Sequence, residues 1–168
     1  MGIKLIDIFI LLYMLYSSAS KYAVRALAYM ATEEDQETFT VEQIARGANV
    51  PKPYLSKVLK QLVSGKILRS NKGPGGGYRF AKDVHDISLY DIKIAIDGMT
   101  EFVECSLGLD SCNDAAPCPA HFIWKELRAA ATKSMQVTTL YAAGKIITEK
   151  MNHPEASKKV MYRRSKDS

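Results

Sequence analysis

A glycine-rich turn between two short strand-like segments limits the possible folds of this chain more than any other sequence feature. The run NKGPGGGYRF has glycine at positions 73, 75, 76 and 77, and it joins residues 66–70 (KILRS) to residues 78–81 (YRFA). Glycine adopts backbone angles that are closed to other residues, so the run predicts a β-hairpin. A nucleotide-binding glycine loop would need a Lys-Ser/Thr pair or the six-position fingerprint, and a helix after it. Neither motif is present, and a strand-like segment follows.

Two short helices are predicted immediately before this hairpin. Thr40 and Gln43 form a capping-box pair that opens a helix over residues 41–48, and a turn at 47–50 leads to a second helix that ends near Ser64. Two helices joined by a three- to four-residue turn and followed by a hairpin are typical of a winged helix-turn-helix. We call the hairpin the wing. The fold class expected is mainly α (α+β).

Positive charge is concentrated in this part of the chain. Residues 40–82 carry nine basic residues and one acid, Glu42, and the tail at 158–168 is also basic, whereas the remainder is net acidic. Such segregation indicates a surface for a polyanion, although a solvated charged face is the alternative.

Further helices are predicted on both sides of the winged unit. The first covers residues 20–34, and Ser88 and Asp91 cap another that ends before Gly98. From about residue 120 a long apolar helical pattern runs onward and restarts at Thr138 or Thr139. We expect a second copy of the chain to cover it as a coiled-coil-like seam, giving a homodimer. Packing against the first helix of the same chain is the alternative.

The expected organisation has five parts. Residues 1–13 form an N-terminal extension, with Met14 as the expected natural start; the alternative is that they are native and pack as an extra apolar arm. Residues 14–98 form the winged domain, 99–121 a cysteine loop, 122–151 the dimerisation region and 152–168 a basic tail. The apolar run at 8–16 is too short to span a bilayer. Three cysteines cannot all pair within one chain, which favours a reducing cytoplasm. No nucleophile–base or acid pair is visible, so we expect no enzyme.

All three cysteines lie in one segment, CSLGLDSCNDAAPCPAH, which ends in a histidine. The spacing of Cys105, Cys112, Cys118 and His121 is C-x6-C-x5-C-x2-H. Thiolates suit iron–sulfur clusters, zinc and monovalent copper. The gaps differ from the C-x2-C knuckle of structural zinc sites, and they allow a loop to wrap a larger group. A cluster, a bare thiol redox switch and zinc all stay open at this point.

Three stretches of the chain resemble the Rrf-type family of bacterial transcription regulators. They are SSASKYAVRALAYMA, VPKPYLSKVLKQLVSGKIL and, most specifically, NKGPGGGYRFAKDVHDISLYDIKIAIDG, and the resemblance covers about residues 14–151. It implies a homodimeric winged-helix protein that binds partly palindromic double-stranded DNA. Many members hold an iron–sulfur cluster on a three-cysteine loop at this place in the chain.

The ligand pattern is most similar to that of IscR-like members, which add a histidine three positions after the last cysteine. The resemblance therefore implies a 2Fe–2S cluster on Cys105, Cys112, Cys118 and His121, whereas NsrR-like members use a ligand from the first helix, where this chain has Lys21. The first gap is one residue longer than usual, which keeps a 4Fe–4S cluster open. The alternative is a cluster-free thiol redox or cysteine-metabolism regulator that docks a metabolic enzyme, as CymR-like members do.

The outward face of the second helix and the wing supply the candidate DNA contacts. We expect Ser56 and Lys57 to meet base edges, and Tyr54 and Lys60 to contact the backbone. IscR-like proteins carry Glu and Gln where Ser56 and Lys57 stand, which predicts a different operator preference. The remaining candidates in this group are Lys52, Lys72, Gly75, Gly76 and Arg79.

The resulting hypothesis is a sensor that controls the spacing of two recognition helices. Gain or loss of the cluster would order or release the loop, and a few ångströms in half-site spacing would switch DNA binding. Iron, oxygen or nitric oxide could be the signal. A redox or metal-handling protein that uses its winged domain only as a scaffold is the rival class of function.

Overall fold

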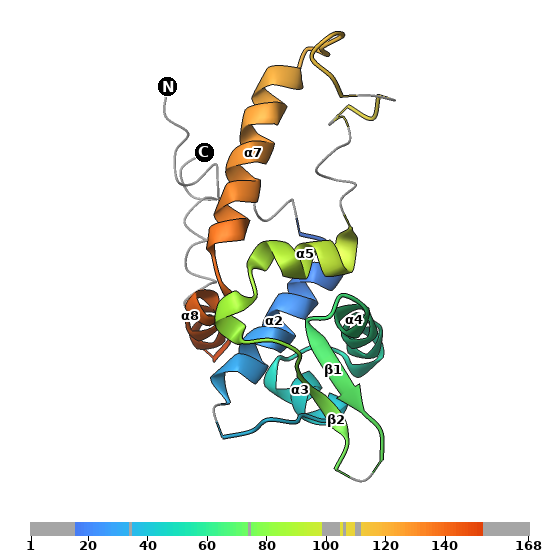
Figure 1. Cartoon of the computed structure of the whole chain (residues 1–168), viewed down its shortest axis with the longest axis vertical. Helices are drawn as coiled ribbons and strands as arrows, with labels where there is room; N and C mark the ends of the chain where they lie inside the picture. The colour runs from blue at the N-terminus through green and yellow to red at the C-terminus, as the bar shows by residue number, and fades with distance from the viewer. Residues whose placement is uncertain are drawn as a thin grey trace, which may run out of the picture.

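Six α-helices, one 3₁₀ helix and a two-stranded sheet form the part of the chain that the computed structural model describes, residues 16–33, 35–73, 75–98, 105, 107–109 and 112–152 (Figure 1). The expectations for residues 1–13, for Met14 and for the tail from 153 onward lie outside the described residues. In chain order the elements are α2 (Ser18–Thr32), α3 (Val41–Gly47), α4 (Lys52–Ser64), β1 (Leu68–Asn71), β2 (Gly77–Phe80), η1 (Val84–Asp86), α5 (Leu89–Asp97), α7 (His121–Val137) and α8 (Leu140–Asn152).

The core lies where α2 meets α3, α4 and α5. Helix α2 contributes small and apolar side chains at helical spacing, and Leu27 is completely buried. Helix α4 turns Leu55, Leu59 and Leu62 inward, and all three are completely buried. Each such side chain contributes about 1.5–3 kcal/mol relative to an exposed one. The winged helix-turn-helix prediction is confirmed.

The first helix of the motif begins as the sequence predicts. The Thr40 hydroxyl accepts a hydrogen bond from the Gln43 backbone N–H at 3.3 Å, and the Gln43 side chain accepts one from the Thr40 N–H at 2.8 Å. This reciprocal pair satisfies two donors that the first turn of α3 leaves open. The turn after α3 places Asn49 in the left-handed region, with φ 49°.

The wing is an antiparallel hairpin in which Leu68 pairs with Phe80 and Arg69 with Arg79. Gly75 at its tip has φ +75°, which explains a glycine there. Gly77 is needed for a different reason, because a Cβ would lie 2.5 Å from the Phe39 carbonyl oxygen. That close approach lets Phe39 and Tyr78 exchange backbone hydrogen bonds and ties the loop before α3 to the wing.

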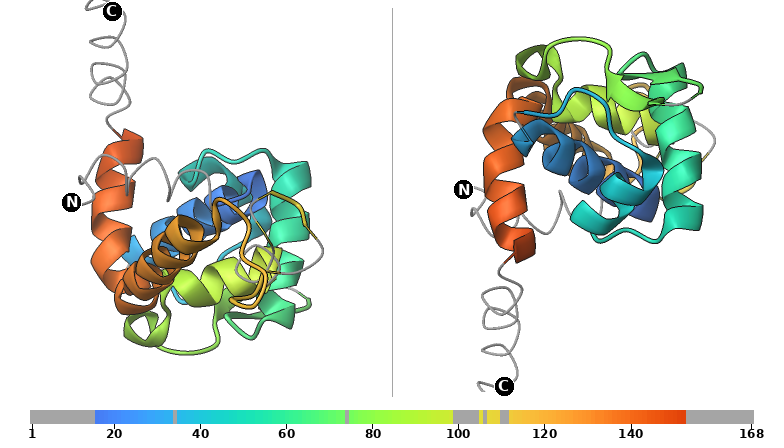
Figure 2. Two further views of the ribbon diagram at one scale, coloured as in Figure 1. Left: turned by 90° about the horizontal axis from the view of Figure 1, so that it is seen from above. Right: turned by 90° about the horizontal axis from the view of Figure 1, so that it is seen from below.

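The C-terminal region forms two helices with a break at residues 138–139. The Leu89 N–H donates to the Thr138 carbonyl at 2.9 Å, and the Leu140 N–H donates to the Ile87 carbonyl at 2.7 Å, so the break is bound to the start of α5. Helix α8 then folds back and lies across α2 (Figure 2). The helix restart predicted at Thr138 or Thr139 is confirmed. Helix α8 packs against α2 of the same chain, which was the alternative to packing against a second copy.

Small residues of α8 and α2 lie next to each other where the two helices meet. A Cβ on Gly144 would lie 3.8 Å from atoms of Ala28 and Ala31, which is ordinary contact distance. Helix α7, in contrast, packs on α5 among the described residues. Large apolar side chains on the rest of α7 are exposed, namely Phe122, Ile123 and Val137. No helix among the described residues is long and apolar enough to cross a membrane.

Candidate functional site

The segment before α7 brings the four predicted donors together as two pairs. The Sγ atoms of Cys105 and Cys118 are 3.8 Å apart, and the Sγ of Cys112 lies 3.4 Å from Nδ1 of His121. The His121 N–H donates to the Cys118 carbonyl at 2.9 Å, which joins the loop to the first turn of α7. The loop lies at the end of α7 that points away from the wing (Figure 1).

His121 is buried although it is polar, with only 3% of its surface exposed. Its Nε2 atom lies 2.7 Å from the Asp114 carboxylate, and the Lys125 ammonium lies 2.6 Å from the other oxygen of that carboxylate. The hydrogen bond from Lys125, followed by the one from His121, holds the pKa of Asp114 below its usual value. The carboxylate therefore stays ionised beside the imidazole.

Hydrogen bonds around Cys105 favour the ionised form of its thiol. Hydrogen bonds from the backbone N–H groups of Leu107 and Leu109 lower the pKa of its thiol, and Cys118 and the positive charge of Arg128 act in the same direction. The Arg128 guanidinium also lies 3.7 Å from the Cys112 Sγ. A lowered thiol pKa favours the thiolate, which is the form that binds a metal.

The donors are arranged as two pairs of soft ligands. Among the described residues, no three His, Cys, Asp or Glu side chains are grouped closely enough to hold a metal ion in this conformation of the loop. A 2Fe–2S cluster instead takes two protein ligands on each iron. Two pairs of soft donors, one Cys–Cys and one Cys–His, match that requirement.

The outward side of α4 carries the candidate DNA contacts from the sequence. Lys52, Lys57 and Lys60 are exposed, and Tyr54 is 64% exposed beside Tyr22 of α2. Ser56 is half-buried, and its hydroxyl donates to the Lys52 carbonyl at 3.1 Å. Its oxygen still has lone pairs to accept a hydrogen bond.

Glu42 is the one acid of the basic segment, and it lies against this helix. Its carboxylate pairs with the Lys52 ammonium, and both side chains are more than half exposed. The hydrogen bond from Lys52 lowers the pKa of Glu42. Lys52 is therefore partly neutralised in the protein without a ligand, unlike Lys57 and Lys60, for which no ion pair is found among the described residues.

A comparison with known proteins identifies the family of the chain. The Rrf2 family model, described as iron-dependent transcriptional regulator, matches residues 16–143. The chain belongs to the Rrf2 family. It is a DNA-binding transcription regulator, and its relatives are regulators rather than enzymes.

Individual Rrf2 relatives cover most of the chain. A protein of Aquifex aeolicus (strain VF5), assigned as an HTH-type transcriptional regulator, is 33% identical over 129 residues, 76% of this chain and 89% of the relative. The regulator IscR of Vibrio parahaemolyticus is 26% identical over 133 residues, 79% of this chain and 77% of IscR. The solved structure of CymR, the global cysteine regulator of B. subtilis, matches with a TM-score of 0.63 at 20% identity, covering 78% of this chain and 96% of CymR. At that identity the likeness to CymR shows the fold.

The wing of this Rrf2 chain carries one basic residue that the sequence did not single out. Of the predicted wing contacts, Lys72, Gly75 and Arg79 are exposed and Gly76 is half-buried. The structure adds Arg69, which is exposed and lies directly opposite Arg79. The signal was available, because residues 69 and 79 fall on the same face once the hairpin register is fixed by its turn.

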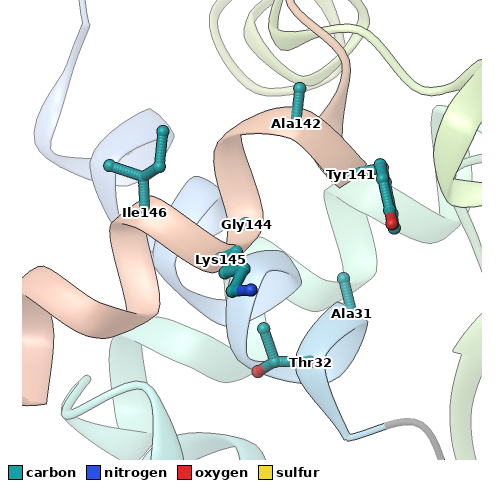
Figure 3. A pocket seen from close by; sticks show the side chains of 7 residues that line it. All are labelled: Ala31, Thr32, Tyr141, Ala142, Gly144, Lys145 and Ile146. Carbon is teal, nitrogen blue, oxygen red and sulfur yellow. The ribbon is translucent and has the colours of Figure 1, made fainter.

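Two open hollows lie outside the cysteine loop. One, of about 460 Å³, lies between the end of α2 and the start of α8 (Figure 3) and is lined by Ala31, Thr32, Tyr141, Ala142, Gly144, Lys145 and Ile146. The other, of about 580 Å³, lies between α2 and α4 beside the candidate base-reading residues, with Tyr22, Tyr54, Lys57 and Gln61 among its lining. Neither contains a cysteine, so no thiol chemistry is expected in them.

Proposed function

We propose that this Rrf2 protein is a homodimeric cytoplasmic regulator whose operator binding depends on an iron–sulfur cluster. The ligands would be Cys105, Cys112, Cys118 and His121, and the cluster would be 2Fe–2S. The observation that carries the proposal is that these donors, all from one segment, form two close pairs, Cys105 with Cys118 and Cys112 with His121. The six-residue first gap leaves 4Fe–4S as the other nuclearity to test.

The residues around the donors support this use. Once bound, the cluster supplies a one-electron redox centre whose presence depends on the supply of iron and sulfide. Arg128 would offset the negative charge that three thiolates bring to the site, because its guanidinium lies beside the Cys112 sulfur. The N–H groups of Leu107 and Leu109 hold Cys105 toward its thiolate form.

We also propose that α7 forms the dimer seam, within a dimerisation region at 122–151. Phe122 and Ile123 are 63% and 64% exposed, and Val137 at the other end of α7 is 71% exposed. A monomer gains nothing from presenting such side chains to water, whereas a second copy of α7 would cover them. In that dimer the cysteine loop, 99–121, lies next to the seam and can act on the relative placement of the two winged domains, 14–98.

On DNA, α4 would enter the major groove and the wing would contact the flanking backbone. Lys57 is suited to donate to guanine acceptors, and Ser56 can reach a neighbouring base edge. Tyr54, Lys52 and Lys60 would contact phosphates. The wing contacts would be Lys72, Gly75, Gly76 and Arg79, where exposed backbone can lie close to the sugar-phosphate chain.

Anaerobic purification tests the cofactor. We expect a coloured protein with two irons and two sulfides per chain, and loss of the colour in Cys105→Ala, Cys112→Ala and Cys118→Ala. The free energy of unfolding of each variant serves as the control for folding. A colourless wild-type protein without iron or sulfide, even after reconstitution, would refute the cluster.

Operator titrations test the assignment of the DNA contacts. Ser56→Ala and Lys57→Ala should change sequence preference, by about 1–3 kcal/mol for a lost bidentate contact. Lys72→Ala should lower affinity for all sequences alike. The opposite pattern would refute the assignment. Cluster-loaded and cluster-free protein are then compared on the same DNA, and equal affinities would remove the sensing role.

One observation favours a second candidate function, a cluster-free thiol switch. The Sγ atoms of Cys105 and Cys118 are close enough for a small movement to form a disulfide. Mild oxidation of cluster-free protein, followed by alkylation and mass measurement, tests for this bond. The metabolic-enzyme partner expected for this alternative stays a prediction.

A further inference from the structure

We infer that Asp114, held by Lys125, fixes the ring of His121 so that Nδ1 is the atom that binds the cluster. This inference rests on the proposed function, because it names the ligating atom and a positioning residue of the same site. It concerns a carboxylate that is not itself one of the four proposed ligands. Asp114 lies in the loop between Cys112 and Cys118, and Lys125 lies on α7 one turn beyond His121.

The two ring nitrogens of His121 face different chemistry. Nε2 lies 2.7 Å from the Asp114 carboxylate, whereas Nδ1 lies 3.4 Å from the Cys112 sulfur. A neutral imidazole has one N–H donor and one lone pair. A carboxylate can only accept, so it selects the tautomer with the proton on Nε2. The lone pair is then on Nδ1, on the side where the cysteine sulfur lies.

The Asp114 carboxylate is held by the Lys125 ammonium as well as by the His121 ring. Both of its oxygens lie within 2.8 Å of the Lys125 ammonium, so the Lys125 side chain spans from α7 to the loop. His121 is 3% exposed, which leaves little room for the ring to turn over. A carboxylate or carbonyl partner on the second nitrogen is the usual device that orients a metal-binding histidine, and its loss typically costs 10–100-fold in metal affinity.

Selective labelling of the two ring nitrogens tests the inference without relying on DNA binding. Wild-type protein is prepared with histidine carrying nitrogen-15 at Nδ1 alone or at Nε2 alone, and the reduced cluster is studied by pulsed electron paramagnetic resonance. We expect strong hyperfine coupling to the Nδ1 label and only weak coupling to the Nε2 label. Strong coupling to the Nε2 label would overturn the inference, and so would an intact cluster without coupling to either label.

Variants of Asp114 test its positioning role. Asp114→Ala should lose its cluster to a chelator about 10–100-fold faster than wild type, and its cluster should show coupling to both labels. Asp114→Asn, whose amide oxygen still accepts the Nε2 proton, should be intermediate. The matched control is Asp83→Ala, because Asp83 makes the same kind of contact with His85, at 2.7 Å, on the surface. Asp83→Ala should leave the chelation rate and the coupling unchanged.

The possible failures are distinguishable. A wild-type protein that takes up no cluster refutes the proposed function, and the inference falls with it. A wild-type cluster with Nδ1 coupling and an Asp114→Ala variant indistinguishable from Asp83→Ala keeps the proposed function and refutes the role of Asp114. The labelling of the wild-type protein needs no variant to fold.

Discussion

Arg69 of β1 lies directly opposite Arg79 of β2, and both side chains are exposed on the outer face of the wing. Like charges opposite each other in a ladder destabilise it by about 0.2–1 kcal/mol. A phosphate between the two guanidinium groups would convert that repulsion into attraction. The pair is therefore expected to weaken the free protein slightly and to strengthen its complex with DNA.

Arg69→Gln and Arg79→Gln test this opposite effect on stability and binding. At low salt each variant should be more stable than wild type by a few tenths of a kcal/mol, measured by thermal unfolding, and the gain should vanish at high salt. Each should also lower the slope of log affinity against log salt, by at most about 0.9, the value for one phosphate contact.

Lys145→Gln is the control for the wing variants, because Lys145 is an exposed cation on α8. It removes the same charge without touching the wing, so its salt slope should equal that of wild type. If the salt slope of a wing variant equals that of Lys145→Gln, the substituted arginine does not contact DNA.

Local signals predicted the winged domain because its elements are specified by nearby residues. The capping boxes at Thr40 and Ser88 and the glycines of the wing act within three or four positions, and the structure has all of them. The fold-back of α8 onto α2 instead brings together residues far apart in sequence, such as Ala28 and Gly144. Helical periodicity is the same whether a helix packs on its own chain or on a partner, so the sequence left both open.

Arg25 shows a second kind of contact that a sequence pattern cannot supply. Its Nε and Nη2 atoms donate to the Ala48 carbonyl at 3.1 and 2.6 Å, and Nη2 also donates to the Asn49 carbonyl. The guanidinium carbon lies 6.0 Å from the centre of the Tyr22 ring. Arg25 therefore fixes the turn between α3 and α4, which sets the angle of the recognition helix.

Arg25→Ala should destabilise the protein by about 1.5–3 kcal/mol, the range for hydrogen bonds to a charged group. Denaturant unfolding measures this loss, and operator affinity should fall with it because the turn is no longer held. Arg25→Lys should recover only part of both, since an ammonium lacks the planar fork. Equal stability of Arg25→Ala and Glu37→Ala, an exposed residue of the loop before α3, would refute the role of Arg25.

The sequence suggests Cys105, Cys112, Cys118 and His121 as donors, which stays a prediction, and it does not show which of them lie next to each other. Spacing alone allows any two of Cys105, Cys112, Cys118 and His121 to be neighbours. The pairing seen here depends on where α7 begins and on the loop contacts of Asp114 and Arg128. These are charged side chains within a polar segment, and nothing in the local pattern distinguishes them from solvent-exposed charges.

Arg128 should raise the reduction potential of the proposed cluster. Its guanidinium lies 3.7 Å from the Cys112 sulfur, and both a positive charge and a hydrogen bond to a ligand sulfur favour the reduced, more negative state. Arg128→Gln is expected to lower the midpoint potential in an anaerobic redox titration, and Arg128→Lys to lower it less. Lys133→Gln removes a cation elsewhere on α7 and should leave the potential unchanged. An Arg128→Gln potential equal to that of wild type would contradict this role.

Asp97, at the end of α5, should make the fold sensitive to acid. Its carboxylate accepts hydrogen bonds from the buried Lys93 ammonium at 2.8 Å and the Ser20 hydroxyl at 2.7 Å, and also from the Ser17 hydroxyl. Burial alone would raise the pKa of Asp97, but these hydrogen bonds outweigh it and lower the pKa. Burial, followed by the charge of Asp97, raises the pKa of Tyr16 to about 12.

The sign of the pH effect follows from the lowered pKa. Stability from Asp97 is fully present above the ordinary carboxyl pKa of about 4 and is lost as the pH falls through the lower folded value. Asp97→Ala should cost about 3–5 kcal/mol at neutral pH, because it removes one partner of a buried ion pair. Its free energy of unfolding should then fall less steeply than that of wild type between about pH 5 and pH 2. Asp35→Ala changes an exposed loop residue and should show the same dependence of unfolding free energy on pH as wild type. If the curve of Asp97→Ala runs parallel to that of Asp35→Ala, Asp97 is not the group responsible for the acid sensitivity.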